Sequence, residues 1–172
     1  MYKNSKFMLE VSIKFQQLIV YEITNTNEKK ILHVYLISTA KNGAGQFKNS
    51  NQTPLGKHYI RAYIGDKQPL NMIFKARRPT GEIYSKILEK NSIEKDFILT
   101  RILWLCGKEI GKNRRGNVDT MQRYIYFHGS PDSNGIFGIP TSHGCIRMRN
   151  KDILHLFNLL NFQKNVEVNI IN

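Results

Sequence analysis

The feature that most constrains this chain is a strict alternation of apolar and polar residues close to its N-terminus. In the stretch MLEVSIKF, every second position is apolar: Leu9, Val11, Ile13 and Phe15. Side chains of a β-strand point to opposite faces in turn, so this pattern predicts a strand with one buried face. Two more apolar runs, QQLIVYEI and KKILHVYLIST, follow with the polar turn TNTNEK between them. The sequence therefore predicts a meander of antiparallel strands.

The remainder of the chain also favours strands. The Gly- and Asn-rich residues 40–55 predict a loop, and the turn Pro54–Gly56 precedes a predicted strand from His58 to Ile64. Three further apolar runs, FILTRILWLCG, RYIYFHGS and VEVNII, predict strands, the second of which is expected to end at His128.

Two segments have helical periodicity. In the C-terminal part, Asn150 is placed to cap a helix and Asp152 lies in its first turn, with apolar residues at helical spacing: Ile153, Leu156, Phe157 and Leu160. A shorter pattern involves Ile83, Ile87 and Leu88. The predicted fold class is mostly β, with sandwich-like mixed β-sheets and one or two short helices, in a single domain over residues 1–172.

The chain is strongly basic. It has 26 Lys and Arg against 13 Asp and Glu, a net charge of +13. Such a charge favours an anionic partner, which is nucleic acid, a membrane face or a carboxylate-rich substrate. Three clusters, KARR, KNRR and RMRNK, suit phosphate contacts, but no helix-turn-helix, zinc-finger or RNP-like motif accompanies them. The N-terminal residues contain no apolar signal-peptide core, and no run approaches the ~20 apolar residues of a transmembrane helix.

Cys145 is the main candidate for chemistry. It lies in SHGCIRM, after Gly144 and two residues before Arg147, whereas Cys106 lies in an apolar run, and we expect no disulfide between the two. A thiol needs a base or a positive environment to become a nucleophile. His143 and Arg147 supply both locally, and the amides of Gly144 and Cys145 are suited to face an oxyanion. The alternative is a small buried cysteine without a catalytic role.

Two histidines compete for the role of base. His143 would point to the same side as Cys145 in an extended segment, while His128 comes from the end of another predicted strand and approaches a sulfur more easily. The same three residues are also possible zinc ligands. The chain has neither a Cys-x-x-Cys pair nor a His-Glu-x-x-His helix, so we predict no metal and no cofactor.

These motifs together resemble the YkuD-type L,D-transpeptidases. The resemblance rests on His128–Gly129, then SHGC followed by Arg147, 17 positions from His128 to Cys145, and on TPLGKHYI further upstream. The resemblance implies a β-sandwich-like catalytic domain with Cys145 as nucleophile and His128 as general base. It further implies roles for other residues: the Gly129 carbonyl orients His128, His143 shapes the site, and Gly144 belongs to the oxyanion hole. Arg147 would order the loop or contact a substrate carboxylate, and Ser142 would contact substrate.

The implied substrate is the tetrapeptide stem of peptidoglycan, which Cys145 would attack at its third residue with release of D-alanine. An L,D-carboxypeptidase with the same nucleophile is the alternative within this chemistry. A non-catalytic basic module that binds wall polymer or nucleic acid is the alternative of another class; we expect no nucleic-acid partner. Arg114 and Arg115, in the basic loop 111–120, are further candidates for carboxylate contacts. The family implies the periplasm or cell envelope, and a complete chain without a signal peptide would imply the cytoplasm.

Overall fold

The structure, a computed structural model, describes residues 6–91, 96–132 and 137–172. Its strands, in chain order, are β1 (Lys6–Ser12), β2 (Gln17–Ile23), β3 (Lys29–Ser38), β4 (Gly56–Ile64), β5 (Met72–Lys75), β6 (Arg78–Ile83), β7 (Ile98–Gly107), β8 (Tyr126–Ser130), β9 (Ile146–Arg149) and β10 (Glu167–Ile171). The helices are α1 (Lys86–Asn91) and α2 (Asn150–Leu160), with a short 3-10 turn at Gly116–Val118.

The strands form one mixed sheet that closes on itself. Their order is β4-β10-β1-β2-β3-β9-β8-β7-β5-β6, and β4 also pairs with β7. Two of the pairings, β1 with β10 and β8 with β9, are parallel, and the others are antiparallel. The predicted mostly β class with few short helices is confirmed, with the refinement that the two sandwich-like layers belong to one continuous sheet.

The predicted meander is confirmed in β1, β2 and β3, which pair in sequence order. Leu9 and Val11 are fully buried, as the alternation predicts. Phe15 was expected on the same buried face, and this prediction is wrong, since its side chain is 65% exposed. The strand ends at Ser12, and residues 13–16 reverse the chain, so the period of two no longer applies at Phe15.

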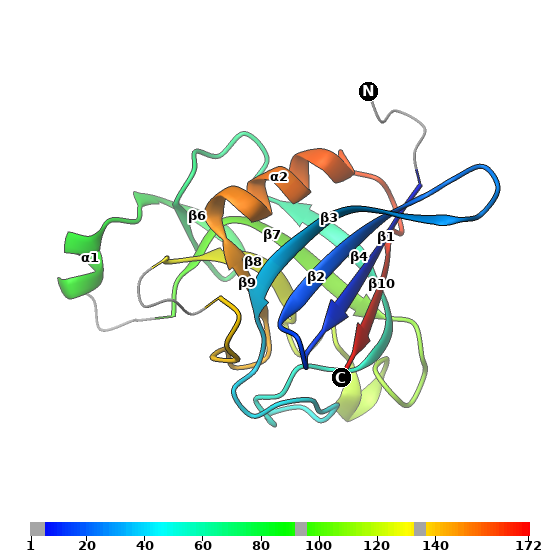
Figure 1. Ribbon diagram of the computed structural model, residues 1–172. Coiled ribbons are helices and arrows are strands. Elements are labelled where there is room, and N and C mark those ends of the chain that lie inside the picture. Colours follow the sequence, from blue (N-terminus) through cyan, green and yellow to red (C-terminus); the bar gives the residue numbers. More distant parts are fainter. Residues whose placement is uncertain (1–5, 92–95, 133–136) are drawn as a thin grey trace.

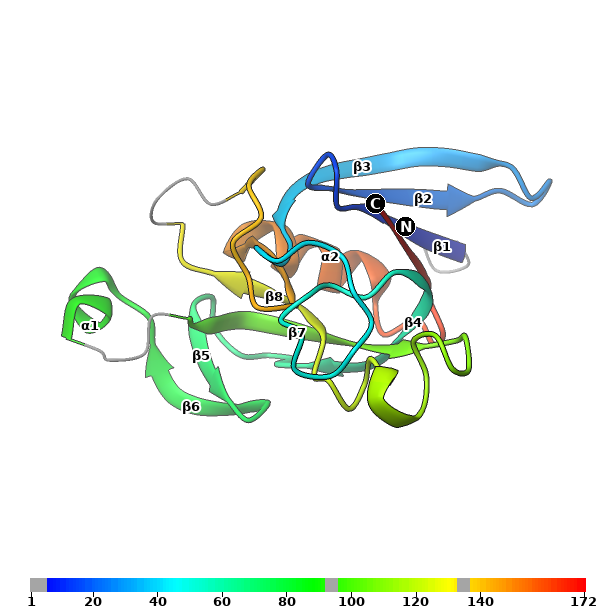
Figure 2. The ribbon, with the colours of Figure 1, turned by 90° about the horizontal axis from the view of Figure 1, so that it is seen from below.

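Helix α2 fills the space between the two layers of the sheet. Figure 2 shows β1, β2 and β3 on one side of it and β4, β7 and β8 on the other. The helix packs on β7, β8 and β9. Its buried side includes the four residues predicted at helical spacing: Ile153, Leu156, Phe157 and Leu160. This core supports the adjacent strands β8 and β9 from their inner face (Figure 1).

The prediction that Asn150 caps α2 is wrong. The N-cap is Arg149, which makes no side-chain capping bond, and Asn150 is the first helical residue. Its buried side chain instead links two strands: Nδ2 donates to Ser130 O (2.9 Å), and Oδ1 accepts from Thr100 Oγ1 (2.6 Å). Thr100 has a φ of 68° at an irregularity of β7, an uncommon conformation for a β-branched residue. Asn150 thus fixes the irregular part of β7 against β8.

The structure before β7 differs from the prediction made from the shorter helical pattern. Ile83 ends β6 rather than belonging to a helix, and α1 covers only Lys86–Asn91 with Ile87 exposed. The strands β5 and β6 form a hairpin that projects beside β7 (Figure 2).

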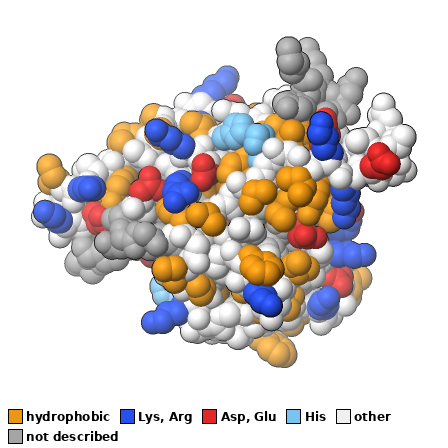
Figure 3. All heavy atoms as spheres, viewed as in Figure 1, with side chains coloured by type: hydrophobic (Ala, Val, Ile, Leu, Met, Phe, Trp, Pro, Cys, Tyr) orange, Lys and Arg blue, Asp and Glu red, His pale blue; other side chains and the backbone are white. Residues whose placement is uncertain are grey.

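The outer face of β2 and β3 is partly apolar. Ile31, Val34 and Leu36 of β3 are exposed, and they lie opposite residues of β2 in the antiparallel register. Figure 3 shows hydrophobic side chains gathered on this face with basic side chains around them. Polar and apolar residues therefore share the solvent-facing side of the meander, while the inner side is almost wholly apolar.

Candidate active site

The parallel pairing of β8 with β9 brings the main candidates together. In this register His128 lies opposite Arg147, and partners in register point to the same face of a sheet. Cys145 directly precedes β9, two residues before Arg147, so it lies on that face too. Phe127, Ile146 and Met148 point the other way and are fully buried in the core. The alternation of two short strands thus separates core from candidate chemistry.

His128 is buried and held in one orientation. It was predicted at the end of its strand, but β8 continues to Ser130, so His128 is the central residue of the strand. Its Nδ1 lies 2.8 Å from Gly129 O. A carbonyl only accepts hydrogen bonds, so Nδ1 carries the proton and Nε2 is the free acceptor. Burial lowers the pKa of His128 to about 4, and the imidazole is neutral near pH 7.

The residue after His128 has no room for a side chain. A Cβ on Gly129 would lie 2.3 Å from Asn150 Oδ1 and 2.7 Å from Leu99 O. The glycine in this pair therefore allows the close contact between β8, β7 and the start of α2 that fixes His128. This is a steric reason for the His-Gly pair in the sequence.

Cys145 is half-buried, and its thiol is protonated at rest. Sγ donates to Tyr124 O at 3.3 Å. Burial raises the pKa of the Cys145 thiol to about 12, and the Asp96 carboxylate adds to this. The Tyr126 N–H and the cations of Arg147 and Arg123 act in the opposite direction without outweighing it. The resting pair is therefore a neutral thiol and a neutral imidazole.

The loop that carries Cys145 is closed by Ser142. The Gly144 N–H donates to Ser142 Oγ (3.1 Å), and Ser142 Oγ donates to Cys145 O (2.6 Å). Gly144 has a φ of +135°, which side chains rarely adopt, so a glycine is required before the cysteine. Ser142 is buried; its hydroxyl bonds within this loop, and its backbone bonds to Thr39 and Lys41. The Gly144 amide, a predicted oxyanion donor, is thus engaged by Ser142.

Thr53, in the TPLG stretch, holds the same loop from the other side. Its buried hydroxyl donates to Gly144 O (3.0 Å) and accepts from Ala40 N (3.0 Å). This stretch was predicted as a turn, and no role was predicted for Thr53. The threonine at the start of the turn connects the long loop 40–55 to the candidate nucleophile.

Asp96 is a site residue that the sequence analysis missed. Its Oδ1 pairs with Arg147 Nη2 (2.7 Å), and its Oδ2 lies 3.0 Å from His143 Nδ1. Burial alone would raise the pKa of Asp96, but Arg147 and His143 outweigh it, and the pKa lies below its ordinary value. A single aspartate in a polar stretch gives no sequence signal, because only the fold brings it to the His128 strand.

Cys145 lines one pocket, and a second pocket shares His143 with it. The first, about 100 Å³, is lined by Asp96, Ile98, His128, Ser142, His143, Cys145 and Arg147. The second, about 190 Å³, is lined by Lys48, Asn49, Asn51, Gln122, Arg123, Tyr124, Ile125 and His143. His143 belongs to both, and its side chain is 71% exposed. His128 and His143 therefore both border the pocket of Cys145, but only His128 is buried.

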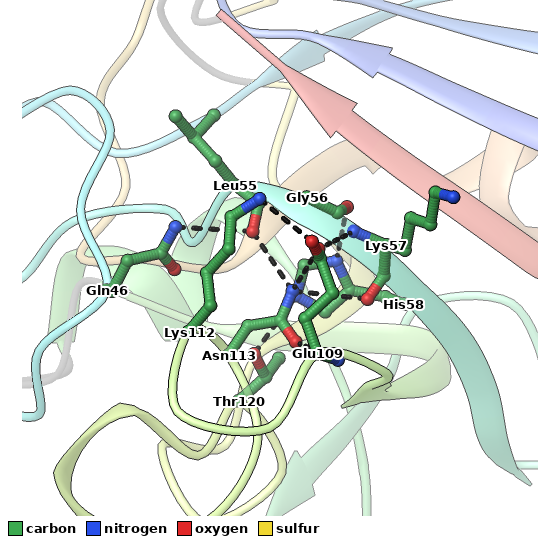
Figure 4. A network of polar contacts seen from close by, with 9 residues as sticks. All are labelled: Gln46, Leu55, Gly56, Lys57, His58, Glu109, Lys112, Asn113 and Thr120. Carbon is green, nitrogen blue, oxygen red and sulfur yellow. Dashed lines mark hydrogen bonds and ion pairs between the residues drawn. The ribbon is translucent and has the colours of Figure 1, made fainter.

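Arg114 and Arg115 are not among the residues that line these two pockets. Their loop is held as a fixed element by the buried Asn113 (Figure 4). Asn113 Nδ2 donates to Leu55 O and Lys57 O, both at 3.1 Å, and Oδ1 accepts from Glu109 N at 2.9 Å. The loop is therefore pinned to the start of β4 rather than poised over Cys145.

The described residues contain no group of three or more His, Cys, Asp or Glu side chains placed to hold a metal ion. Over the same residues, no helix has the length and apolar character needed to cross a membrane. Both cysteines are free thiols.

The fold and the site define a β-rich domain with a histidine on one strand and a cysteine directly before the adjacent parallel strand. Residues 6–168 match the model of the L,D-transpeptidase catalytic domain family, YkuD. The chain belongs to this family. The family acts on peptidoglycan peptides and is usually found in the cell envelope. No curated protein of similar sequence was found.

Several solved structures share the fold. Bd1075 of Bdellovibrio bacteriovorus is 16% identical, with a TM-score of 0.58 over 97% of this chain and 48% of its own. An L,D-transpeptidase from Mycobacterium smegmatis is 14% identical, with a TM-score of 0.54 over 98% of this chain and 59% of its own. LdtMt1, solved in complex with imipenem, is 16% identical, with a TM-score of 0.54 over 97% of this chain and 59% of its own. This chain spans about half to three-fifths of their lengths.

Proposed function

We propose that this protein is a cysteine L,D-transpeptidase that acts on peptidoglycan stem tetrapeptides. The observation that carries the proposal is that Cys145 and His128 line one pocket, with the His128 ring held by the Gly129 carbonyl. Membership of the L,D-transpeptidase catalytic domain family supports it. The high positive charge suits a substrate rich in carboxylates.

The first half-reaction begins from the neutral pair. His128 Nε2 takes the Cys145 proton as the sulfur attacks the carbonyl carbon of the third stem residue, so a thiolate forms only with the new S–C bond. The resulting oxyanion needs N–H donors. The Cys145 amide is one, and the Gly144 amide becomes a second once it leaves Ser142 Oγ. The C–N bond then breaks, His128 returns its proton to the leaving amine, and D-alanine departs from a thioester on Cys145.

The second half-reaction transfers the acyl group. An amine attacks the thioester, His128 accepts its proton, and the proton returns to the Cys145 sulfur as the S–C bond breaks. If water replaces the amine, the product is a tripeptide and the enzyme is an L,D-carboxypeptidase. The pocket is bordered by the exposed His143, so water can reach it. The experiment below therefore decides whether the acceptor is an amine or water.

The test is to incubate the protein with a tetrapeptide muropeptide and to record intact masses of protein and products. We expect release of D-alanine and an acyl adduct that Cys145→Ala does not form. Cross-linked product indicates transpeptidation, and tripeptide alone indicates carboxypeptidation. If the unmodified protein neither releases D-alanine nor forms an adduct, the proposed enzymatic activity is wrong.

Imipenem provides a second, substrate-independent readout, because LdtMt1 was solved in complex with it. We expect a mass increase of the protein that is absent in Cys145→Ala. The His128→Ala variant should acylate at least 100-fold more slowly, since a general base contributes about 10²–10⁴-fold. Unchanged acylation in that variant would assign the base to His143. Nucleic-acid binding that is steeply salt-dependent and survives Cys145→Ala would favour the non-catalytic basic module.

A further inference from the structure

The tip of the β5–β6 hairpin has an unusual backbone. Ala76 and Arg77 connect the two strands, with φ values of 46° and 66°. Two-residue turns of this kind favour Asn and Gly, because other residues are strained at positive φ. The chain therefore accepts backbone strain to place an arginine at this position, and strain of this kind concentrates at functional sites.

The Arg77 guanidinium lies beside two neighbouring aromatic rings, whose centroids are 6.1 Å apart. Its Cζ lies 4.9 Å from the centroid of Trp104 and 4.8 Å from that of Tyr124. Its Nη1 donates to Tyr126 Oη at 3.2 Å. A guanidinium has five N–H donors, and this is the single hydrogen bond of the Arg77 side chain to the described residues. The rings contact the guanidinium without using its N–H groups, so its other donors are left for a ligand.

The same aromatic residues adjoin the nucleophile. The Tyr124 carbonyl accepts the hydrogen bond of Cys145 Sγ, and Tyr124 also borders the second pocket. Cys145 and Trp104 both pack against a buried cluster that includes Tyr126. Tyr126 is therefore close to both Arg77 and Cys145.

The other arginines beside the site are already occupied. Arg147 is paired with Asp96, and Arg123 donates to the carbonyls of three residues of the loop 40–53: Gly45, Gln46 and Gln52. A carboxylate that binds at Arg147 must displace Asp96, and one that binds at Arg123 must displace backbone carbonyls. A carboxylate that binds at Arg77 displaces no protein carboxylate or carbonyl, because the one hydrogen bond of this side chain to the described residues goes to the Tyr126 hydroxyl.

We propose that Arg77 binds a carboxylate of the acyl-donor peptide and so sets where the peptide lies relative to Cys145. The proposal rests on the proposed function for its ligand, a peptide that bears several carboxylates. Arg77 is then a specificity residue: it recognises a charge that is the same before and during the attack of Cys145. It therefore strengthens donor binding and leaves the chemical step at Cys145 largely unchanged.

Binding without turnover tests this proposal. The Cys145→Ala protein is titrated with the stem tetrapeptide and with versions in which one carboxylate at a time is an amide. Trp104 is the single tryptophan of the chain, so its fluorescence reports ligands that reach Arg77. We expect one amide to bind about tenfold more weakly than the tetrapeptide, as for a lost charged hydrogen bond.

The decisive comparison repeats the titration after Arg77→Gln and after Arg78→Gln, the matched control. Arg78 is the next residue and is exposed. The preference for the free carboxylate should disappear in Arg77→Gln and persist in Arg78→Gln, with thermal unfolding showing that each variant is folded. An unchanged preference in Arg77→Gln, or no binding of the tetrapeptide at millimolar concentration, would overturn the proposal. The acyl adduct of the unmodified protein tests the proposed function separately. The proposed function and the proposed role of Arg77 can therefore be contradicted independently.

Discussion

The Thr53 hydroxyl donates to the Gly144 carbonyl across 91 residues of sequence, at 3.0 Å. Because the same hydroxyl accepts from the Ala40 amide, it completes the hydrogen bonding of two backbone groups inside the protein. The position of the loop that carries Cys145 therefore depends on a buried side chain in the turn before β4, far from Cys145 in the sequence.

Thr53→Val should destabilise the protein and slow acylation of Cys145. Valine has the shape of threonine but leaves two buried backbone groups without a partner, which costs about 1–3 kcal/mol. Urea unfolding measures the first effect and the rate of imipenem adduct formation the second. Thr26→Val, at an exposed turn, is the control and should change neither. Equal stability of Thr53→Val and the parent would contradict the assigned bond.

Gly129→Ala should lower the free energy of unfolding by about 1–3 kcal/mol, the usual cost of an overpacked site. The new Cβ would fall 2.3 Å from Asn150 Oδ1, so α2 and β8 must move apart. Because that movement also displaces His128, acylation should fall in the protein that remains folded. Denaturant unfolding gives the first quantity; an alanine variant with full stability would show that the three elements have room to adjust.

Acid should destabilise the protein through two buried histidines. Burial lowers the pKa of His58 and of His128 to about 4, below the ordinary 6.5 of an unfolded chain. Between these pH values the unfolded chain binds more protons than the folded one. The free energy of unfolding therefore decreases as pH falls from 6.5 towards 4, by up to about 1.4 kcal/mol per pH unit for each histidine.

Urea unfolding between pH 7 and pH 4.5 measures this dependence. His58 is suited to a test because it hydrogen-bonds Gly56 and Thr120, away from the Cys145 pocket. His58→Gln should show roughly half the pH slope of the parent protein. A slope equal to that of the parent would mean that His58 is not buried in its neutral form.

Asp96→Asn should make Cys145 more reactive towards iodoacetamide. The Asp96 carboxylate raises the pKa of the Cys145 thiol, so removing its charge lowers that pKa and increases the thiolate fraction at a given pH. The rate is followed by mass spectrometry of the Cys145 peptide against pH. The exposed Asp66→Asn is the control. A slower reaction in Asp96→Asn would contradict the stated effect of the carboxylate.

Much of this architecture follows from local pattern in the sequence. The alternation around Leu9 and the helical spacing around Ile153 predicted buried faces correctly, because each reports only which side meets the core. The alternation failed at Phe15, where a reversal of the chain ends the strand. Local pattern says where side chains point, and it does not say where a strand stops.

The contacts within the site depended on pairing instead. His128 and Cys145 stood out by their residue type and neighbours. Asp96 and Thr53 did not, because each acts through a partner distant in sequence: Arg147 for Asp96 and Gly144 for Thr53. The position of Asn150 predicted a helix cap, but its side-chain amide bonds to Thr100 of β7 and Ser130 of β8 instead. The register of a closed sheet decides such contacts.

The position of β9 between β3 and β8 has a consequence for the order of folding. Both neighbours lie well before it in the chain, and its pairing with β8 is parallel. Such non-local pairings form slowly, because loop-closure entropy is lost before the contacts are gained. A growing or partly folded chain therefore carries Cys145 as an ordinary thiol. The pocket that Cys145 shares with His128 exists only when the sheet is complete.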